Sequence, residues 1–93
     1  MDIKNISDFR RAYRNGPYAW PGGYPLYFVA DDGAALSFAA VKENLRQIID
    51  AIAHKTRDGW RVIGLEINYE DAELYCAHTG ERIESAYAEE DKP

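Results

Sequence analysis

The sequence predicts an α+β domain: a small antiparallel β-sheet packed on one central α-helix, with a short helix at the N-terminus. Two patterns carry this prediction, since residues 38–55 have apolar side chains at helical spacing and residues 60–69 alternate as a strand does. The helical face consists of Val41, Leu45, Ile48, Ile49 and Ile52, and the strand face of Ile63, Leu65, Ile67 and Tyr69. The remaining apolar runs are short and are expected to be strands, apart from the N-terminal helix. The expected order of elements is therefore α-β-β-α-β-β-β.

The chain of 93 residues has the length of one domain. We expect residues 1–88 to form it and residues 89–93 to be a disordered acidic tail, because they are almost all charged. The start of the sequence lacks the basic and apolar stretches of a signal peptide, and no segment approaches the roughly 20 apolar residues of a membrane span. A cytoplasmic protein without a membrane partner is therefore expected, and the single cysteine agrees with a reducing compartment.

The first part of the chain combines a helix with an irregular loop. Ser7 is expected to cap a helix that runs from Asp8 to about Asn15, and Gly16 followed by Pro17 should end it. Residues 17–25 are expected to lack regular structure, because three prolines each remove a backbone donor and two glycines add flexibility.

Short strands and turns account for most of the rest. Residues 26–30 and 34–36 are expected to pair around a turn at residues 31–33. Asp31 and Asp32 could form a pair of carboxylates in a site, but Asp-Asp-Gly between two apolar runs primarily indicates a turn. Ser37 should cap the central helix. A last hairpin is expected to pair residues 74–77 with 81–85.

Cys76-Ala77-His78-Thr79-Gly80 is the stretch most suggestive of chemistry. A zinc knuckle has the pattern Cys-x-x-Cys-Gly, and here Thr79 stands at the second cysteine. Cys76, His78 and His54 would supply only three ligands, with His54 far away at the other end of the central helix. A Cys76 and His78 nucleophilic dyad is the enzymatic alternative, but no motif supplies a third group. We therefore expect no metal, no cofactor and no catalysis.

Two longer motifs resemble a family of small proteins from phages, plasmids and proteobacterial genomes. They are Tyr-Ala-Trp-Pro-Gly-Gly-Tyr-Pro-Leu-Tyr-Phe at residues 18–28 and Cys-x-His-x-Gly-x-Arg-Ile-x-Ser-Ala-Tyr at residues 76–87. The resemblance implies a zinc-ribbon-like fold, because some relatives carry cysteines that match Ser37, Ala40, Cys76 and Thr79. This chain keeps one of the four, so the resemblance implies a ribbon whose metal site has been lost.

Two surfaces are the candidate binding sites. Net charge is -5, but residues 66–93 hold nine of the sixteen acidic residues and only two of the eleven basic ones. The acidic candidates are Glu66, Glu70, Asp71, Glu73, Glu81 and Glu84. The aromatic candidates are Tyr18, Trp20 and Tyr24, which are expected either to close over the core or to contact a partner.

These features favour a protein that binds the basic surface of a nucleic-acid-binding host protein or complex through carboxylates. Such an inhibitor or adaptor, encoded by a phage or other mobile element, would be similar in character to anti-CRISPR proteins and other mimics of nucleic acid. Direct nucleic-acid binding is disfavoured by the acidic end. It stays open as the alternative, in a module derived from a zinc ribbon with Trp20 or Tyr24 stacking on bases. The basic residues for that alternative are Arg10, Arg11, Arg14, Lys42, Arg46 and Arg57.

Overall fold

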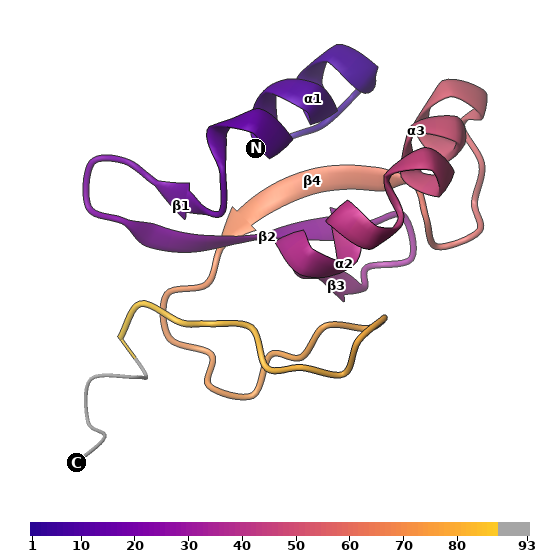
Figure 1. Ribbon diagram of the computed structural model, residues 1–93. Helices are drawn as coiled ribbons and strands as arrows, with labels where there is room; N and C mark the ends of the chain where they lie inside the picture. Colours follow the sequence, from indigo (N-terminus) through magenta and orange to yellow (C-terminus); the bar gives the residue numbers. More distant parts are fainter. Residues whose placement is uncertain (88–93) are drawn as a thin grey trace.

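The computed structural model describes residues 1–87 as three helices and a four-stranded antiparallel sheet (Figure 1). The expected tail at residues 89–93 lies outside the described residues. The helices are α1 (Ile6–Asn15), α2 (Phe38–Glu43) and α3 (Leu45–His54), and the strands are β1 (Tyr18–Ala19), β2 (Tyr24–Ala30), β3 (Ala35–Leu36) and β4 (Val62–Ile67). The α+β class with an antiparallel sheet is thus confirmed, but the order of elements is α-β-β-β-α-α-β.

Strand β2 is central to the sheet. It pairs with β4 along most of its length, with β1 at one end and with β3 at the other. In Figure 1, α1 and α3 lie on one side of β2 and β4, and the segment after β4 runs on the other. Phe28 of β2 has no exposed surface and packs against the rings of Phe9 and Phe38 at centroid distances of 5.6 and 4.5 Å. This aromatic contact fastens α1 and α2 to the sheet.

The expected N-terminal helix exists, but Ser7 does not cap it. Helix α1 begins at Ile6, and the side-chain oxygen of Asn5 accepts from the backbone N–H of Asp8 at 2.8 Å. The carboxylate of Asp8 accepts in return from the N–H of Lys4, so two exposed donors are satisfied at the helix start. Gly16 ends the helix with a φ of 90°, as its sequence position predicts.

The expectation of an irregular segment at residues 17–25 was wrong. Tyr18 and Ala19 pair with Pro25 and Tyr24, so the segment is a β-hairpin with residues 20–23 at its tip. The prolines are tolerated because they serve as acceptors: the carbonyl of Pro17 accepts from Leu26, and that of Pro25 accepts from Asn68. The turn at residues 31–33 and the pairing of β2 with β3 are confirmed.

The single central helix was also wrong, because Asn44 divides it into α2 and α3. The side-chain amide of Asn44 donates to the carbonyl of Ala40 at 2.8 Å, which is the acceptor that its own N–H would use in a continuous helix. The backbone N–H of Asn44 bonds Val41 instead. The apolar face survives the break, since Val41, Ile48 and Ile52 are all buried.

Strand β4 is shorter than expected, and its inward face differs. The pairing with β2 shifts between Val29 and Ala30, so Ile63 is an extra residue in a bulge and is 40% exposed. Val62 is buried in its place, and Tyr69 lies exposed beyond the end of the strand. The last hairpin is present only as a single bridge between Tyr75 and Arg82, flanked by backbone hydrogen bonds.

Candidate functional site: an aromatic groove beside acidic residues

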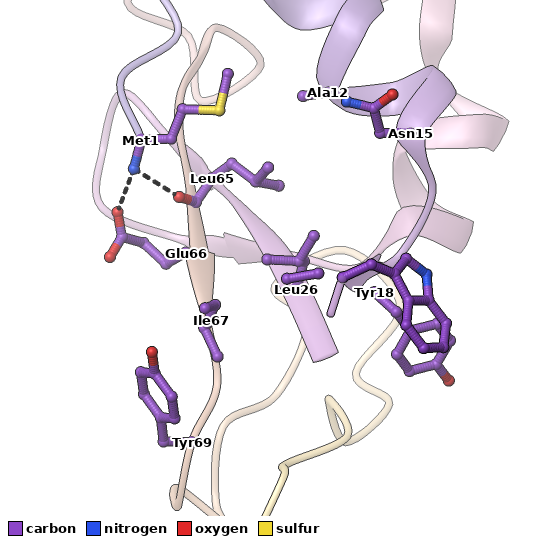
Figure 2. A pocket seen from close by; sticks show the side chains of 11 residues that line it. Met1, Ala12, Asn15, Tyr18, Leu26, Leu65, Glu66, Ile67 and Tyr69 are labelled. Carbon is purple, nitrogen blue, oxygen red and sulfur yellow. Dashed lines mark hydrogen bonds and ion pairs between the residues drawn. The ribbon is translucent and has the colours of Figure 1, made fainter. Parts of the chain in front are cut away.

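A hollow lies where α1, the β1–β2 hairpin and β4 meet (Figure 2). Its volume is about 620 Å³, and we call it the aromatic groove. The side chains of Leu26, Leu65 and Ile67 contribute its apolar lining from the two paired strands. Its other lining residues include Ala12, Asn15, Tyr18, Trp20, Glu66 and Tyr69. The groove is therefore mostly apolar, with one carboxylate at its margin.

Trp20 stands at the tip of the hairpin and is 77% exposed, more than any other large apolar residue of the described chain. Gly23, the last residue of this tip, has a φ of 67°, a backbone conformation that favours glycine. A Cβ at Gly22, where φ is 107°, would lie 2.7 Å from the ring of Tyr24. With 77% of its surface exposed, the indole of Trp20 does not close over the core.

Tyr18 and Tyr24 take different roles. The hydroxyl of Tyr18 donates to the carboxylate of Glu84 at 2.7 Å, and this bond, followed by burial, raises the pKa of Tyr18. Tyr24 contacts the rings of Tyr69 and Tyr87 at 5.6 and 6.2 Å, and the hydroxyl of Tyr87 donates to that of Tyr24. The β1–β2 hairpin, which carries the aromatic candidates, is thus joined to the segment that carries the acidic residues.

All six acidic candidates are exposed, and the structure brings several of them together. The carboxylate of Glu66 forms an ion pair with the N-terminal ammonium of Met1, at an N–O distance of 3.4 Å (Figure 2). Burial, and after it the charges of Glu66 and Asp71, raises the pKa of Tyr27, so these two carboxylates act on one hydroxyl. The register that pairs Tyr75 with Arg82 places Glu73 opposite Glu84. Two further candidates, Glu70 and Glu81, lie respectively after Tyr69 and on the return arm of that hairpin.

Asn68 positions this acidic segment, and the sequence analysis missed it. It is 3% exposed, and its side-chain amide donates to the carbonyls of Asp71, Ile83 and Glu84. Its side-chain oxygen accepts from the N–H of Asp71, and its own N–H donates to Pro25. One side chain therefore ties the acidic turn and the last segment together next to β2. A lone asparagine before an acidic turn carries no signal in sequence that would distinguish this role.

The environment of Cys76 brings distant residues together. Its thiol is in the core, 2% exposed, and accepts from the N–H and the hydroxyl of Ser37, whose Oγ lies 3.6 Å from the sulfur. Burial raises the pKa of this thiol, but hydrogen bonds from the backbone and side chains of Ser37 and Thr79 outweigh it and lower the pKa to about 7. Ala40 completes the arrangement by donating its N–H to the hydroxyl of Ser37.

Within residues 1–87, no hydrogen bond joins His78 to the sulfur of Cys76. The ring of His78 instead packs edge-on against that of Trp60, at a centroid distance of 5.4 Å. Within the same range, no three side chains of the histidine, cysteine, aspartate or glutamate type come close enough to hold a metal ion. Asp31 and Asp32 serve the turns, accepting from the backbone N–H groups of Gly59 and Ala34.

The basic residues considered for nucleic-acid binding are all exposed. Arg14 and Lys42 line one shallow hollow of about 400 Å³, to which Tyr13 and Phe38 contribute stacked rings at 6.3 Å. Trp20 belongs to the aromatic groove and does not line this hollow.

Comparisons with protein-family models, curated proteins and solved structures found no match for this chain. Among its described residues, the structure contains no helix with the length and apolar character needed to cross a bilayer.

Proposed function

We propose that this chain is a non-enzymatic binding protein that contacts a basic partner surface with the aromatic groove and the acidic residues beside it. The exposed indole of Trp20 at the mouth of that groove is the observation that carries the proposal, because a tryptophan that is 77% exposed has little role in the core. Tyr18, hydrogen-bonded to Glu84, links the aromatic anchor to the carboxylates. An apolar anchor with acidic neighbours matches a partner segment that combines apolar and cationic side chains.

The partner we propose is a nucleic-acid-binding host protein or complex, with the chain acting in the cytoplasm as an inhibitor or adaptor. A protein that binds a phosphate backbone presents a basic groove, and carboxylates on one surface can occupy it. The resemblance to phage and plasmid proteins supports the anti-CRISPR-like version of this proposal.

Affinity capture with matched variants tests it. The immobilised chain is incubated with lysate of the organism that encodes it, as wild type, as Trp20→Ala and as Glu70→Lys/Glu73→Lys. The last pair reverses two exposed charges and leaves the hydrogen bonds of Asn68 and Asp71 in place. Each test variant should capture at least about tenfold less of a specific partner than wild type does. Added DNA should compete with that capture. Lys42→Glu/Arg46→Glu, on the helices, is the matched control and should retain the partner.

Retention of that partner by both test variants, with loss in the control, would contradict the proposal and favour the alternative. In the alternative, a nucleic-acid-binding module uses the hollow between Arg14 and Lys42. Its own test is a labelled single-stranded DNA or RNA, whose binding should weaken with salt and with Arg14→Ala/Lys42→Ala.

We also propose that the hairpin of residues 74–85, here the Cys76 hairpin, and the start of α2 retain the framework of a zinc ribbon. Two sulfur ligands of a tetrahedral zinc lie about 3.8 Å apart, and the separation of Ser37 Oγ from Cys76 Sγ is 3.6 Å. Gly80, with a φ of 77°, donates its N–H to the carbonyl of Cys76 and closes the turn. The residues present do not fit zinc, because Cys76 is the one thiol and Ala40 has no donor atom.

A further inference from the structure

We propose that the junction of residues 3–7, α3 and β4 binds the phosphate group of a small phosphorylated ligand. This site, called the basic junction, is independent of the aromatic groove and of the proposed function. It rests on three cationic side chains, Lys4, Lys55 and Arg61, which line one hollow of about 330 Å³. They come from three separate parts of the chain, so nothing in the local sequence indicates that they meet.

The charge of this hollow is unusual for an acidic protein. Its other lining residues are apolar, so no carboxylate shares it. Within the described residues, none of the three cations forms an ion pair; the one ion pair there joins Met1 and Glu66. Three unpaired cations that line one hollow repel one another, and an anion would relieve that repulsion.

Arg61 adds the second observation. Its Nε is buried and has no hydrogen-bond partner in the part of the chain described. An unsatisfied guanidinium N–H is rare in a folded protein. Arg61 already lines the hollow, and its Nε would give up no hydrogen bond in binding a ligand there. There, Nε and a terminal nitrogen together would donate to two oxygens of a phosphate.

The start of α1 extends the same positive region. Lys4 and Lys55 also line an adjoining hollow of about 380 Å³, together with Asn5, Ile6 and Ser7 at the helix start. In Figure 1 this end of α1 lies beside α3. The first turn of a ten-residue helix is the positive end of its dipole, which favours a phosphate. The carboxylate of Asp8 accepts from the N–H of Lys4 nearby but lines neither hollow.

Lys55 is the C-cap residue of α3. It follows α3 with a φ of 53°, and the N–H groups of Lys55 and Thr56 bond the last turn of the helix. This conformation suits glycine or asparagine better than lysine. This backbone position places Lys55 at the edge of the hollow.

The apolar walls define the class of ligand. Ile3, Ile52 and Ile63 line the hollow with the three cations, and Ile63 is 40% exposed because the bulge turns it outward. A ligand that uses the whole site therefore carries a phosphate together with an apolar or aromatic part. A nucleoside monophosphate has both features, and inorganic phosphate has only the first.

The experiment is a titration followed by ¹H–¹⁵N NMR, with the Arg61 Nε–H resonance as the direct readout. Inorganic phosphate, adenosine monophosphate and adenosine are the probes, with sodium chloride added to keep ionic strength constant. Adenosine monophosphate should shift the Arg61 Nε–H signal and the amides of residues 4–7 and 55 at submillimolar concentration. Inorganic phosphate should shift the same signals at higher concentration, and adenosine should shift none of them.

Arg61→Gln and Lys55→Asn should each weaken binding about tenfold, because each removes one charge-assisted contact. Asparagine keeps the left-handed backbone at position 55, so that variant tests the charge even if Arg61→Gln does not fold. Arg57→Gln, which removes an exposed cation outside the hollow, is the matched control and should bind like wild type. Unchanged Arg61 and Lys55 signals up to millimolar phosphate and nucleotide would overturn the proposal, as would equal weakening by the Arg57 control. Shifts confined to a single-stranded oligonucleotide would also overturn it and assign the cations to nucleic acid.

Discussion

Single residues carry much of what is unusual in this protein, and Cys76 is the first of them. A buried thiol normally has a raised pKa, because burial disfavours the thiolate. Here the N–H and hydroxyl groups of Ser37 and Thr79 donate to the sulfur and reverse that tendency. The thiol therefore titrates close to neutral pH although it is a core residue.

This titration predicts a dependence of stability on pH. The folded pKa of about 7 lies below the ordinary value of 9.0, so the thiolate is favoured in the folded state. The contribution of Cys76 to the free energy of unfolding should be complete above pH 9 and should be lost as the pH falls through about 7. Urea denaturation of wild type and Cys76→Ala at several pH values, compared by difference, measures it.

The ultraviolet absorbance of the thiolate gives the pKa directly, with Cys76→Ala as the blank. Ser37→Ala should raise the pKa of Cys76, because the sulfur loses the hydroxyl donor of Ser37 and keeps only the backbone N–H of that residue. A pKa that stays at 9 in wild type would contradict the role given to these hydrogen bonds.

Asn68 is the second such residue. Replacement of its side chain by alanine leaves three backbone carbonyls and one N–H without their partner. We expect Asn68→Ala to lower the free energy of unfolding by about 3 kcal/mol, measured by urea denaturation. The contact between the rings of Tyr24 and Tyr87 should also loosen in this variant, and near-ultraviolet circular dichroism detects that change.

Asn44→Ala is the matched control, because Asn44 is also buried but donates to one carbonyl, at a helix break. Alanine favours the continuous helix, so the change should cost less than about 1 kcal/mol. Equal losses in the two variants would show that Asn68 is an ordinary buried asparagine.

At the scale of elements, the Cys76 hairpin and α2 form the unit from which a metal site could be rebuilt. Ser37 is the N-cap of α2 and Ala40 lies in its first turn, while Cys76 and Thr79 lie in the hairpin turn with the same spacing, and Ser37 contacts Cys76. If this is the framework of a zinc ribbon, the missing ligands can be restored without moving the backbone.

Ser37→Cys/Ala40→Cys/Thr79→Cys should therefore bind one zinc per chain and should show the visible spectrum of tetrahedral thiolate coordination with cobalt. Its thermal unfolding should shift upward when zinc is added. The misplaced variant Ser37→Cys/Ala40→Cys/Ala77→Cys has the same number of thiols and should bind at least about tenfold more weakly. Equal affinity of the two variants would remove the support for a ribbon framework.

The two helices around Asn44 show which features the apolar spacing predicts and which it does not. Apolar spacing from Val41 to Ile52 predicted the buried face correctly, because that spacing survives a one-residue interruption. The break itself follows from an asparagine side chain that competes for a backbone acceptor, which spacing does not report. The bulge at Ile63 is similar, since it depends on pairing with β2.

Over the whole molecule, the net charge of -5 conceals two differently charged regions. Carboxylates of the last segment lie near the aromatic groove, and cations from three parts of the chain line the basic junction. The two proposals use separate residues, so the variants of one serve as tests of independence for the other. Trp20→Ala should leave the nucleotide titration unchanged, and Lys55→Asn should leave capture of a protein partner unchanged.

The sequence by itself determined the α+β class, the turn at residues 31–33, the buried helical face and the exposure of the six acidic candidates. Each of these depends on residue types and spacing within about ten neighbouring positions, and backbone geometry fixes such relations locally. The tertiary structure alone decided that Asn68 holds the acidic segment and that Lys4, Lys55 and Arg61 share a hollow. Asn68 and Glu84 are 16 residues apart, and the three cations come from separate parts of the chain, so only the packing of the helices and the last segment against β2 and β4 brings them together.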